Sequence, residues 1–274
     1  MNEHQSTNKT PPTPKQNNQA PSWAFIAAAG MGNRMRPLTD HLPKPLIVVR
    51  GQSLLDHIVD RLLAAGITDI VLNTHYHSAQ IEEWAQNRAA CTPPLKITLF
   101  HEPELLDTGG GIENVLTQDQ RTTPFYMING DAFWVDDAVE PSLKSLSQHW
   151  QNSSDILCLL LEPTAQMKLT TAVGDYNIKA PDRAERCADQ TGDYMFTGLR
   201  IVHPDILHYK PASDTAPKYS FLALMDAAEK NGRLGAHIHK GRWHHLSTPA
   251  DVASVNQATM NTSENSIKNA AKRG

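Results

Sequence analysis

The sequence predicts an α/β fold, a Rossmann-like and mostly parallel sheet with helices on both faces. Three observations indicate it: short apolar runs, segments of helical spacing between them, and a regular alternation of the two through the first half of the 274 residues. Buried parallel strands are typically continuous apolar runs because helices cover both faces of the sheet.

The elements can be placed in order along the chain. The apolar run Ala24–Ala29 ends at Gly30, as a buried strand would, and Ser53 begins a helix with a capping-box pattern that Gly66 ends. Residues 170–191 have weak periodicity and are expected to form loops or a small β excursion. Further strands are expected at 69–73, 96–100, 124–128, 155–161, 194–202 and 234–239, and further helices at 79–88, 111–116, 141–151, 220–230 and from about 249.

The ends of the chain differ in composition from the middle. Residues 1–22 are rich in Asn, Gln, Thr, Pro and Lys and are predicted to be a disordered tail, and residues 263–274 a polar tail. A single domain is expected over residues 23–262.

Composition excludes several functions. With 25 Lys+Arg against 29 Asp+Glu and no basic cluster, a nucleic-acid partner is not expected. No apolar run approaches the roughly 18 to 20 residues that span a bilayer, and no secretory leader is recognised, so no membrane association is expected. The three scattered cysteines fit neither a disulfide framework nor a zinc site, which makes a reducing cytoplasm the predicted location. Oligomeric state is not indicated.

The first candidate ligand site follows the first strand. Small residues there, Ala27 and Ala28, let a ligand lie against the backbone, and Gly30 and Gly32 let the loop turn its N–H groups toward phosphate oxygens. Arg34 and then Lys44, within Pro43-Lys44-Pro45-Leu46, add positive charge where a polyphosphate would lie. A glycine pair after a strand also fits an ordinary tight turn, but the added basic residues favour an anion site.

Taken with two further motifs, this segment resembles the sugar-1-phosphate nucleotidyltransferases, and the resemblance extends over residues 23 to about 260. The further motifs are Leu106-Asp107-Thr108-Gly109-Gly110-Gly111-Ile112 and Asn129-Gly130-Asp131. Their form is most similar to that of bacterial N-acetylmuramate-1-phosphate uridylyltransferases of cell-wall recycling.

The resemblance implies a GT-A-like fold, with a nucleotide-binding half at 23–162 and a sugar-binding half at 163–262. It implies a nucleoside triphosphate, UTP favoured, and a sugar-1-phosphate as partners, with Mg²⁺ as cofactor and Mn²⁺ as an alternative. Expected catalytic residues are Arg34, Lys44 and Asp131, with Asp131 at the carboxyl end of a strand as the metal ligand. Expected nucleotide contacts are Ala27, Ala28, Gly30, Gly32, Asn73, Gly109 and Gly110, and expected sugar contacts are Asn129, Thr197 and Gly198.

One late segment departs from the family pattern Trp-x-Asp-x-Gly-Thr-Pro. Here His245 stands where the family has a second metal-binding carboxylate, and Ser247 stands in the glycine position. Mg²⁺ prefers oxygen ligands, whereas imidazole suits transition metals better. Four interpretations stay open: Asp131 and substrate phosphates hold the metal, another acid replaces the ligand, the metal preference changes with His245 as a ligand, or His245 only packs at the rim.

Alternative functions also stay open. The same chemistry could use a mannose- or heptose-type phosphate with GTP, or phosphocholine with CTP. A different class of function is a non-catalytic sensor of nucleotide sugars that has lost one metal ligand. Asp131 alone could be a turn residue, because Asn-Gly and Gly-Asp form turns readily.

Overall fold

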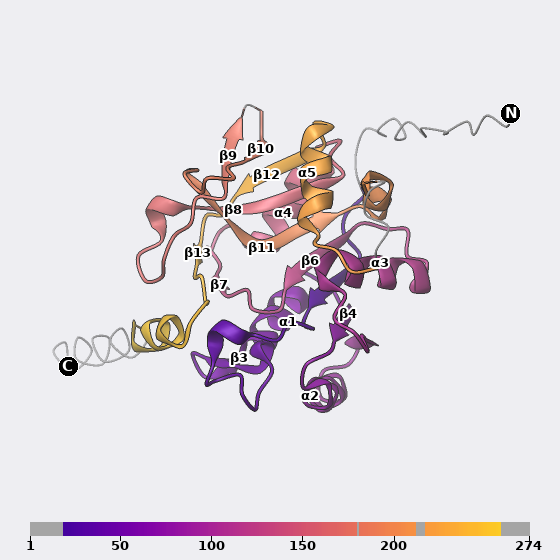
Figure 1. Ribbon diagram of the computed structural model, residues 1–274, viewed down its shortest axis with the longest axis vertical. Coiled ribbons are helices and arrows are strands. Elements are labelled where there is room, and N and C mark those ends of the chain that lie inside the picture. Colours follow the sequence, from indigo (N-terminus) through magenta and orange to yellow (C-terminus); the bar gives the residue numbers. More distant parts are fainter. Residues whose placement is uncertain (1–18, 180, 212–216, 259–274) are drawn as a thin grey trace, which may run out of the picture.

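The computed structural model describes residues 19–179, 181–211 and 217–258, and within these a mixed sheet forms the centre of the molecule (Figure 1). Its nine strands are β1 (Trp23–Ala27), β4 (Asp69–Thr74), β5 (Lys96–His101), β6 (Phe125–Asn129), β8 (Leu157–Pro163), β9 (Tyr176–Lys179), β10 (Arg183–Arg186), β11 (Tyr194–Val202) and β12 (Leu234–Ile238).

The sheet order is β5-β4-β1-β6-β11-β8-β12-β10-β9. The strands of the first half, β5, β4, β1 and β6, are parallel neighbours. Strand β11 then lies antiparallel between β6 and β8, and β12 is parallel to β8. The α/β class is therefore confirmed, and every antiparallel pairing within this sheet includes a strand from the second half of the chain.

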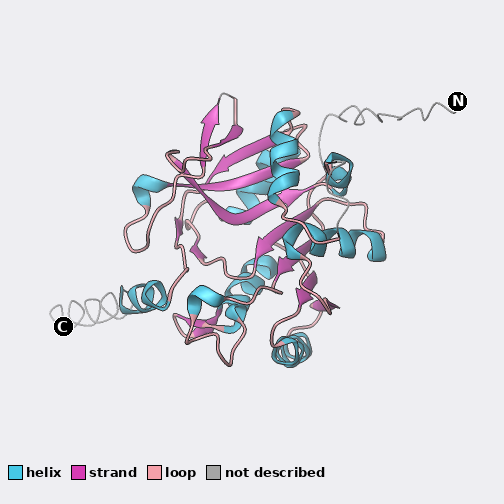
Figure 2. Cartoon of the chain, in the orientation of Figure 1, coloured by secondary structure: helices cyan, strands magenta, loops and turns pink. Residues whose placement is uncertain are grey.

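Helices cover both faces of this sheet (Figure 2). One core cluster contains Leu55 and Ile58 of α1 and Leu146 of α4, and the other contains Ile112 of α3 and Leu224 of α5. Each helix turns its apolar residues toward the sheet, which leaves the carboxyl ends of the strands open for a ligand. The helices are α1 (Leu54–Ala64), α2 (Ser78–Cys91), α3 (Asp107–Asp119), α4 (Ser142–Gln151) and α5 (Leu222–Lys230), with residues 249–258 also helical.

The predicted elements are present, with differences at several boundaries. Strand β1 ends at Ala27, so the two alanines that follow belong to the loop, and α3 begins at Asp107 rather than near residue 111. The weakly periodic segment 170–191 contains the β9–β10 hairpin, as expected for a small β excursion. Two short antiparallel pairs were not predicted: β2 (Val48–Val49) pairs with β3 (Gln52–Ser53), and β7 (Trp134–Val135) pairs with β13 (Arg242–Trp243).

The predicted tails lie mostly outside the described residues. Residues 1–18 and all of 263–274 fall outside them. At residues 19–22 the chain already contacts the domain, because the Gln19 carbonyl accepts a hydrogen bond from Trp150 Nε1 at 2.9 Å and the Ser22 N–H donates to Pro124. No helix among the described residues is long and apolar enough to cross a membrane.

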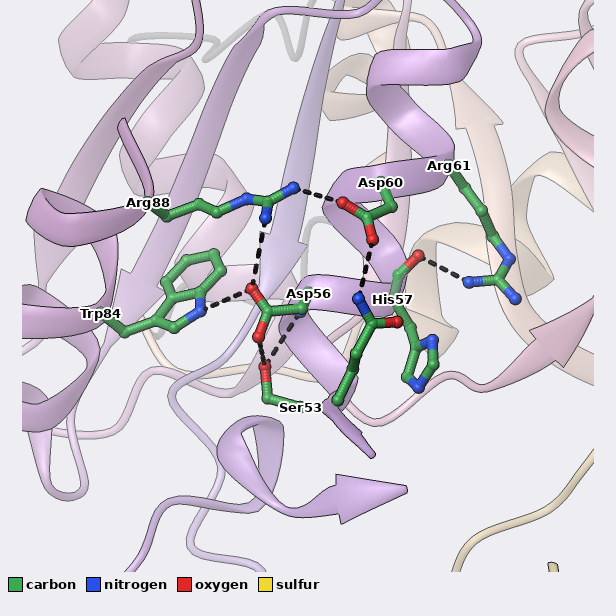
Figure 3. Close-up of polar contacts among 8 residues, drawn as sticks. Ser53, Asp56, His57, Asp60, Arg61, Trp84 and Arg88 are labelled. Carbon is green, nitrogen blue, oxygen red and sulfur yellow. Dashed lines mark hydrogen bonds and ion pairs between the residues drawn. The ribbon is translucent and has the colours of Figure 1, made fainter. Parts of the chain in front are cut away.

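A polar network joins α1 to α2 (Figure 3). The predicted cap is present, since Ser53 Oγ accepts the Asp56 N–H at 3.0 Å. The Asp56 carboxylate accepts from Trp84 Nε1 at 3.1 Å, and Arg88 of α2 pairs with both Asp56 and Asp60 of α1. The network lies on the helices and not at the strand ends, so it has a structural role.

Candidate active site

A cavity of about 540 Å³ opens at the carboxyl ends of three adjacent parallel strands. Ala27 ends β1, and its register partners are Asn73 on β4 and Asn129 at the end of β6, so all three lie at one level of the sheet. All three line the cavity. Ligands of open α/β sheets bind at this edge.

Residues 28–32, which follow β1 and which we call the glycine loop, form one wall of the cavity. Gly32 has φ +62°, and a Cβ there would lie 3.0 Å from Thr39 Cγ2 and 3.1 Å from Lys44 Cβ, so both conformation and space require glycine. Within the described residues, the N–H groups of Gly30 and Met31 donate no hydrogen bond, so they are free to bind an anion.

Lys44 and Asp131 meet inside the cavity. Pro43 and the short 3₁₀ turn Lys44–Leu46 set the direction of the lysine, and its Nζ lies 2.5 Å from Asp131 Oδ2. Asp131 comes two residues after the end of β6. Arg34 lies in the 3₁₀ turn Asn33–Met35, which buried Met35 anchors, and its side chain lines the cavity from the exposed side. The structure thus brings together the three residues expected to be catalytic.

Asn73 holds the glycine loop in place through a side-chain hydrogen bond. Its Oδ1 accepts the Ala28 N–H at 2.8 Å, and its Nδ2 donates to Glu102 Oε1 at 2.7 Å. Glu102 is 1% exposed, and its Oε2 accepts the Leu106 N–H at 2.9 Å just before α3. One buried carboxylate therefore connects the glycine loop with the start of α3, and no sequence motif predicted this role for Glu102.

Gly109 and Gly110, which we expected to face the nucleotide, do not line the cavity. Both N–H groups donate to the Tyr219 carbonyl, at 3.0 and 3.2 Å. A Cβ at Gly109 would lie 2.5 Å from the Tyr219 ring, and one at Gly110 would lie 2.1 Å from the Pro217 carbonyl. The geometry therefore shows a packing reason for these glycines. On this side the cavity is lined instead by Leu105, Asp107, Thr108 and Lys218.

The expected sugar-contacting residues take different places. Asn129 lines the cavity, but Thr197 is 2% exposed and its hydroxyl donates to the Leu160 carbonyl at 2.8 Å. Gly198 has φ +80°, and a Cβ there would lie 3.1 Å from Asn129 Cβ. Of these three residues, only Asn129 lines the cavity, and Gly198 packs against the Asn129 side chain.

His245 is half-buried beside the cavity. The pairing of β13 with β7 brings the segment after Trp243 close to the segment after Asp131. Burial lowers the pKa of the His245 imidazole, and the nearby Asp131 carboxylate opposes that shift. The backbone N–H of His245 donates to Thr170 Oγ1 at 3.0 Å. In the part of the chain that the structure describes, no three His, Cys, Asp or Glu side chains are grouped to hold a metal ion.

The fold and the cavity define an α/β protein with a glycine loop and basic side chains at the ends of its parallel strands. Residues 23–261 match the family described as nucleotidyl transferase. The chain belongs to this family, and the resemblance to sugar-1-phosphate nucleotidyltransferases is confirmed.

Two curated relatives are similar over nearly their whole length. The N-acetylmuramate alpha-1-phosphate uridylyltransferase of Caulobacter vibrioides is 30% identical over 84% of this chain and 94% of its own. That of Neisseria meningitidis serogroup B is 31% identical over 82% and 93%. A mannose-1-phosphate guanyltransferase of Neurospora crassa is 28% identical over 83% of this chain, which spans 61% of that protein.

Solved structures show the same fold. A UDP-glucose pyrophosphorylase complexed with UDP-glucose superposes with a TM-score of 0.71 at 16% identity, covering 88% of this chain and 99% of that one. The inositol-1-phosphate CTP transferase of T. maritima gives 0.69 at 14% identity, covering 87% and 97%. These likenesses support the predicted fold class.

Proposed function

We propose that the protein transfers a uridylyl group from UTP to N-acetylmuramate 1-phosphate, giving UDP-N-acetylmuramate and pyrophosphate. The observation that carries the proposal is the similarity to two uridylyltransferases over more than nine-tenths of their length, in a chain whose cavity brings Arg34, Lys44 and Asp131 together. The proposed reaction would return a cell-wall sugar to the nucleotide-sugar pool. It consumes a nucleoside triphosphate, in keeping with the predicted cytoplasmic location.

In this reaction a phosphate oxygen of the sugar attacks the α-phosphorus of UTP. A new P–O bond forms while the bond from the α-phosphorus to the bridging oxygen breaks, and pyrophosphate leaves with that electron pair. The attacking phosphate is already largely ionised at neutral pH, because its second pKa is about 6, so the protein needs no general base. Catalysis then comes from positioning and charge stabilisation.

The residues of the cavity fit these tasks. The free N–H groups of Gly30 and Met31 bind triphosphate oxygens, and Arg34 and Lys44 stabilise the negative charge that grows on the leaving pyrophosphate. Asn73 and Glu102 hold the loop in place. Asn129 lies where β6 ends, level with Ala27 of β1, and lines the same cavity.

Asp131 is the residue that would hold Mg²⁺. Its side chain is 39% exposed, and a hard carboxylate in a triphosphate cavity suits this ion, which commonly takes one or two protein carboxylates and completes its shell with phosphate oxygens and water. When bound, Mg²⁺ supplies further charge neutralisation at the phosphates.

His245 lies close enough to act electrostatically on Asp131, and replacing it by the family carboxylate, His245→Asp, tests its contribution. A changed Mg²⁺ or Mn²⁺ titration supports a ligand role, whereas an unchanged one shows that His245 only packs at the rim.

Pyrophosphate release measures the function. The purified protein is assayed against a grid of nucleoside triphosphates and sugar-1-phosphates, with Mg²⁺ and with Mn²⁺, and we expect the highest rate with UTP and N-acetylmuramate 1-phosphate. Arg34→Met should lower that rate, whereas Arg36→Met should not, because exposed Arg36 pairs with Asp40 and does not line the cavity.

Each other outcome of the grid favours an alternative. A preference for GTP with mannose 1-phosphate would place the chain with the guanyltransferases that it also resembles. Nucleotide binding without release from any pair would contradict the enzymatic proposal and favour a nucleotide-sugar sensor.

A further inference from the structure

A second cavity, of about 350 Å³, adjoins the first. Thr108 and Asn129 line both, so a ligand held at the strand ends can extend from one cavity into the other. Residues that line the second cavity include Phe196 and Arg200 of β11, and Phe221 and Met225 at the start of α5. The residues that we assign to the nucleotide do not reach it, so it is available for the acceptor.

Arg200 is a buried cation in the wall of this cavity. It is 2% exposed, and its guanidinium carbon lies 4.6 Å from the centre of the Phe221 ring and 5.2 Å from that of Phe196. The one hydrogen bond of its side chain within the described residues runs from Nη1 to Asn129 Oδ1, at 3.3 Å. Its Nε is buried and has no hydrogen-bond partner there.

No acidic side chain among the described residues pairs with Arg200. The other arginine of the cavity, Arg186, differs in this respect, since its Nε lies 2.7 Å from Asp226 Oδ1. Asp175 also lines the cavity, but its Oδ2 accepts the Phe196 N–H at 3.2 Å, and its electrostatic partner is His245. Burial lowers the pKa of Arg200 to about 9, so the group is still charged near neutral pH.

A buried and unpaired charge is costly for a folded protein, so a cation in this state points to an anionic ligand. The guanidinium presents a planar fork that matches a carboxylate, and the neighbouring aromatic and methionine side chains suit an apolar substituent beside it. The first cavity already offers phosphate oxygens three basic side chains in its lining, those of Arg34, Lys44 and Lys218.

We propose that Arg200 binds a carboxylate on the acceptor sugar and thereby selects a carboxylate-bearing sugar-1-phosphate over its neutral counterpart. The inference rests on the proposed function and makes it more specific. N-acetylmuramate differs from N-acetylglucosamine by a lactyl ether, whose one carbon next to the ether oxygen carries both a carboxylate and a methyl group. Both parts have a counterpart in the second cavity: the carboxylate pairs with Arg200, and the methyl group packs on Phe221 and Met225.

The test compares two acceptors in two variants. Arg200→Met keeps the length of the side chain and removes the charge, and Arg200→Lys keeps the charge and removes the fork. With UTP, we expect Arg200→Met to lower kcat/KM for N-acetylmuramate 1-phosphate by about 30-fold or more, mainly through a higher KM. The kcat/KM for N-acetylglucosamine 1-phosphate should change little. Arg200→Lys should recover part of the discrimination.

Stability measurements separate this role from a structural one. Because Arg200→Met removes an unpaired buried charge, the melting temperature of the variant should equal or exceed that of the wild type. Arg121→Met is the matched control, since Arg121 also stacks on an aromatic ring, Trp23 at 4.5 Å, but pairs with Asp69 and lies outside both cavities. The Arg121→Met control should have a lower melting temperature than the wild type. Its ratio of kcat/KM values for the two acceptors should equal that of the wild type.

The outcomes distinguish this inference from the proposed function. If Arg200→Met lowered kcat/KM equally for both acceptors, or for neither, the proposed role of Arg200 would be wrong, but the proposed uridylyltransferase function would stand. If the wild type used no N-acetylmuramate 1-phosphate at all, the proposed function would fail, and calorimetric binding of free N-acetylmuramate would decide the inference. Binding that is lost in Arg200→Met would support it, and an absence of binding to the wild type would overturn it.

Discussion

Lys44 Nζ lies 2.5 Å from Asp131 Oδ2, so a side chain from the segment after the glycine loop pairs with one from the end of β6. The lysine is the more buried partner, with 12% of its side chain exposed against 39% for the aspartate. In the proposed reaction, the triphosphate oxygens would offer the lysine a second anionic partner, and Asp131 would then be available to a cation. The pair therefore holds both charges in position before the substrate arrives.

The first prediction concerns this pair. Asp131→Asn keeps the size of the side chain and removes its charge, and we expect kcat for pyrophosphate release to fall by about 10²-fold or more. Lys44→Met should have a similar effect, and the double variant should lose less than the product of the two losses, because the residues act as a unit. A wild-type kcat in Asp131→Asn would contradict the role assigned to the carboxylate.

A second prediction concerns Glu102, which accepts hydrogen bonds from Asn73 and from the Leu106 N–H. Glu102→Gln places an amide donor against one of these donors, so the free energy of unfolding in urea should fall by about 1 to 3 kcal/mol. We also expect kcat/KM to fall about tenfold, because the glycine loop loses its support. Glu83→Gln, on the exposed surface of α2, is the control and should stay within about 0.5 kcal/mol of the wild type. An unchanged stability in Glu102→Gln would mean that the buried carboxylate does not hold the loop.

The elements that were predicted correctly are those that a local sequence pattern defines. The apolar strand before Gly30, the cap at Ser53 and the strand end before Asp131 each follow from a few neighbouring residues, and the structure contains all three elements. The cavity residues near these ends were predictable because parallel strands place their carboxyl ends at one edge.

Residues defined by distant contacts were not predictable in this way. Glu102 matters because Asn73, 29 positions earlier, lies beside it, and Gly109 needs its lack of a side chain because Tyr219 packs there. Arg200 did leave a signal, since it is a charged residue in the otherwise apolar end, residues 199–202, of strand β11. A single sequence, however, does not show that its neighbours are aromatic rings and not an acid.

The third prediction compares two glycines of similar conformation. Gly198 has φ +80° and Gly66 has φ +82°, but a Cβ at Gly198 would meet Asn129 at 3.1 Å whereas one at Gly66 would meet nothing within 4 Å. Both Gly→Ala variants should lose about 1 to 2 kcal/mol of stability, because alanine is strained at positive φ. Only Gly198→Ala should also raise KM for the acceptor, since it displaces Asn129 at the junction of the two cavities. Equal KM values in the two variants would show that Asn129 does not contact the acceptor.

The fourth prediction concerns stability in acid. His237 on β12 is half-buried, with its ring 5.1 Å from that of His149 and its Nε2 3.9 Å from Glu140 Oε1. Burial lowers the pKa of His237 to about 4, and the like charge of His149 acts in the same direction. In the unfolded chain the ring titrates with a pKa of about 6.5.

The sign of the effect follows from this difference. Between about pH 6.5 and pH 4 the unfolded state binds a proton that the folded state does not, so stability falls as the pH falls through that range. Urea unfolding at pH 7.5 and pH 4.5 measures this loss, and the wild type should lose on the order of 2 kcal/mol more than His237→Gln. His101→Gln, which changes an exposed histidine, should lose as much as the wild type. If His237→Gln lost as much stability as the wild type, protonation of His237 would not be what destabilises the fold in acid.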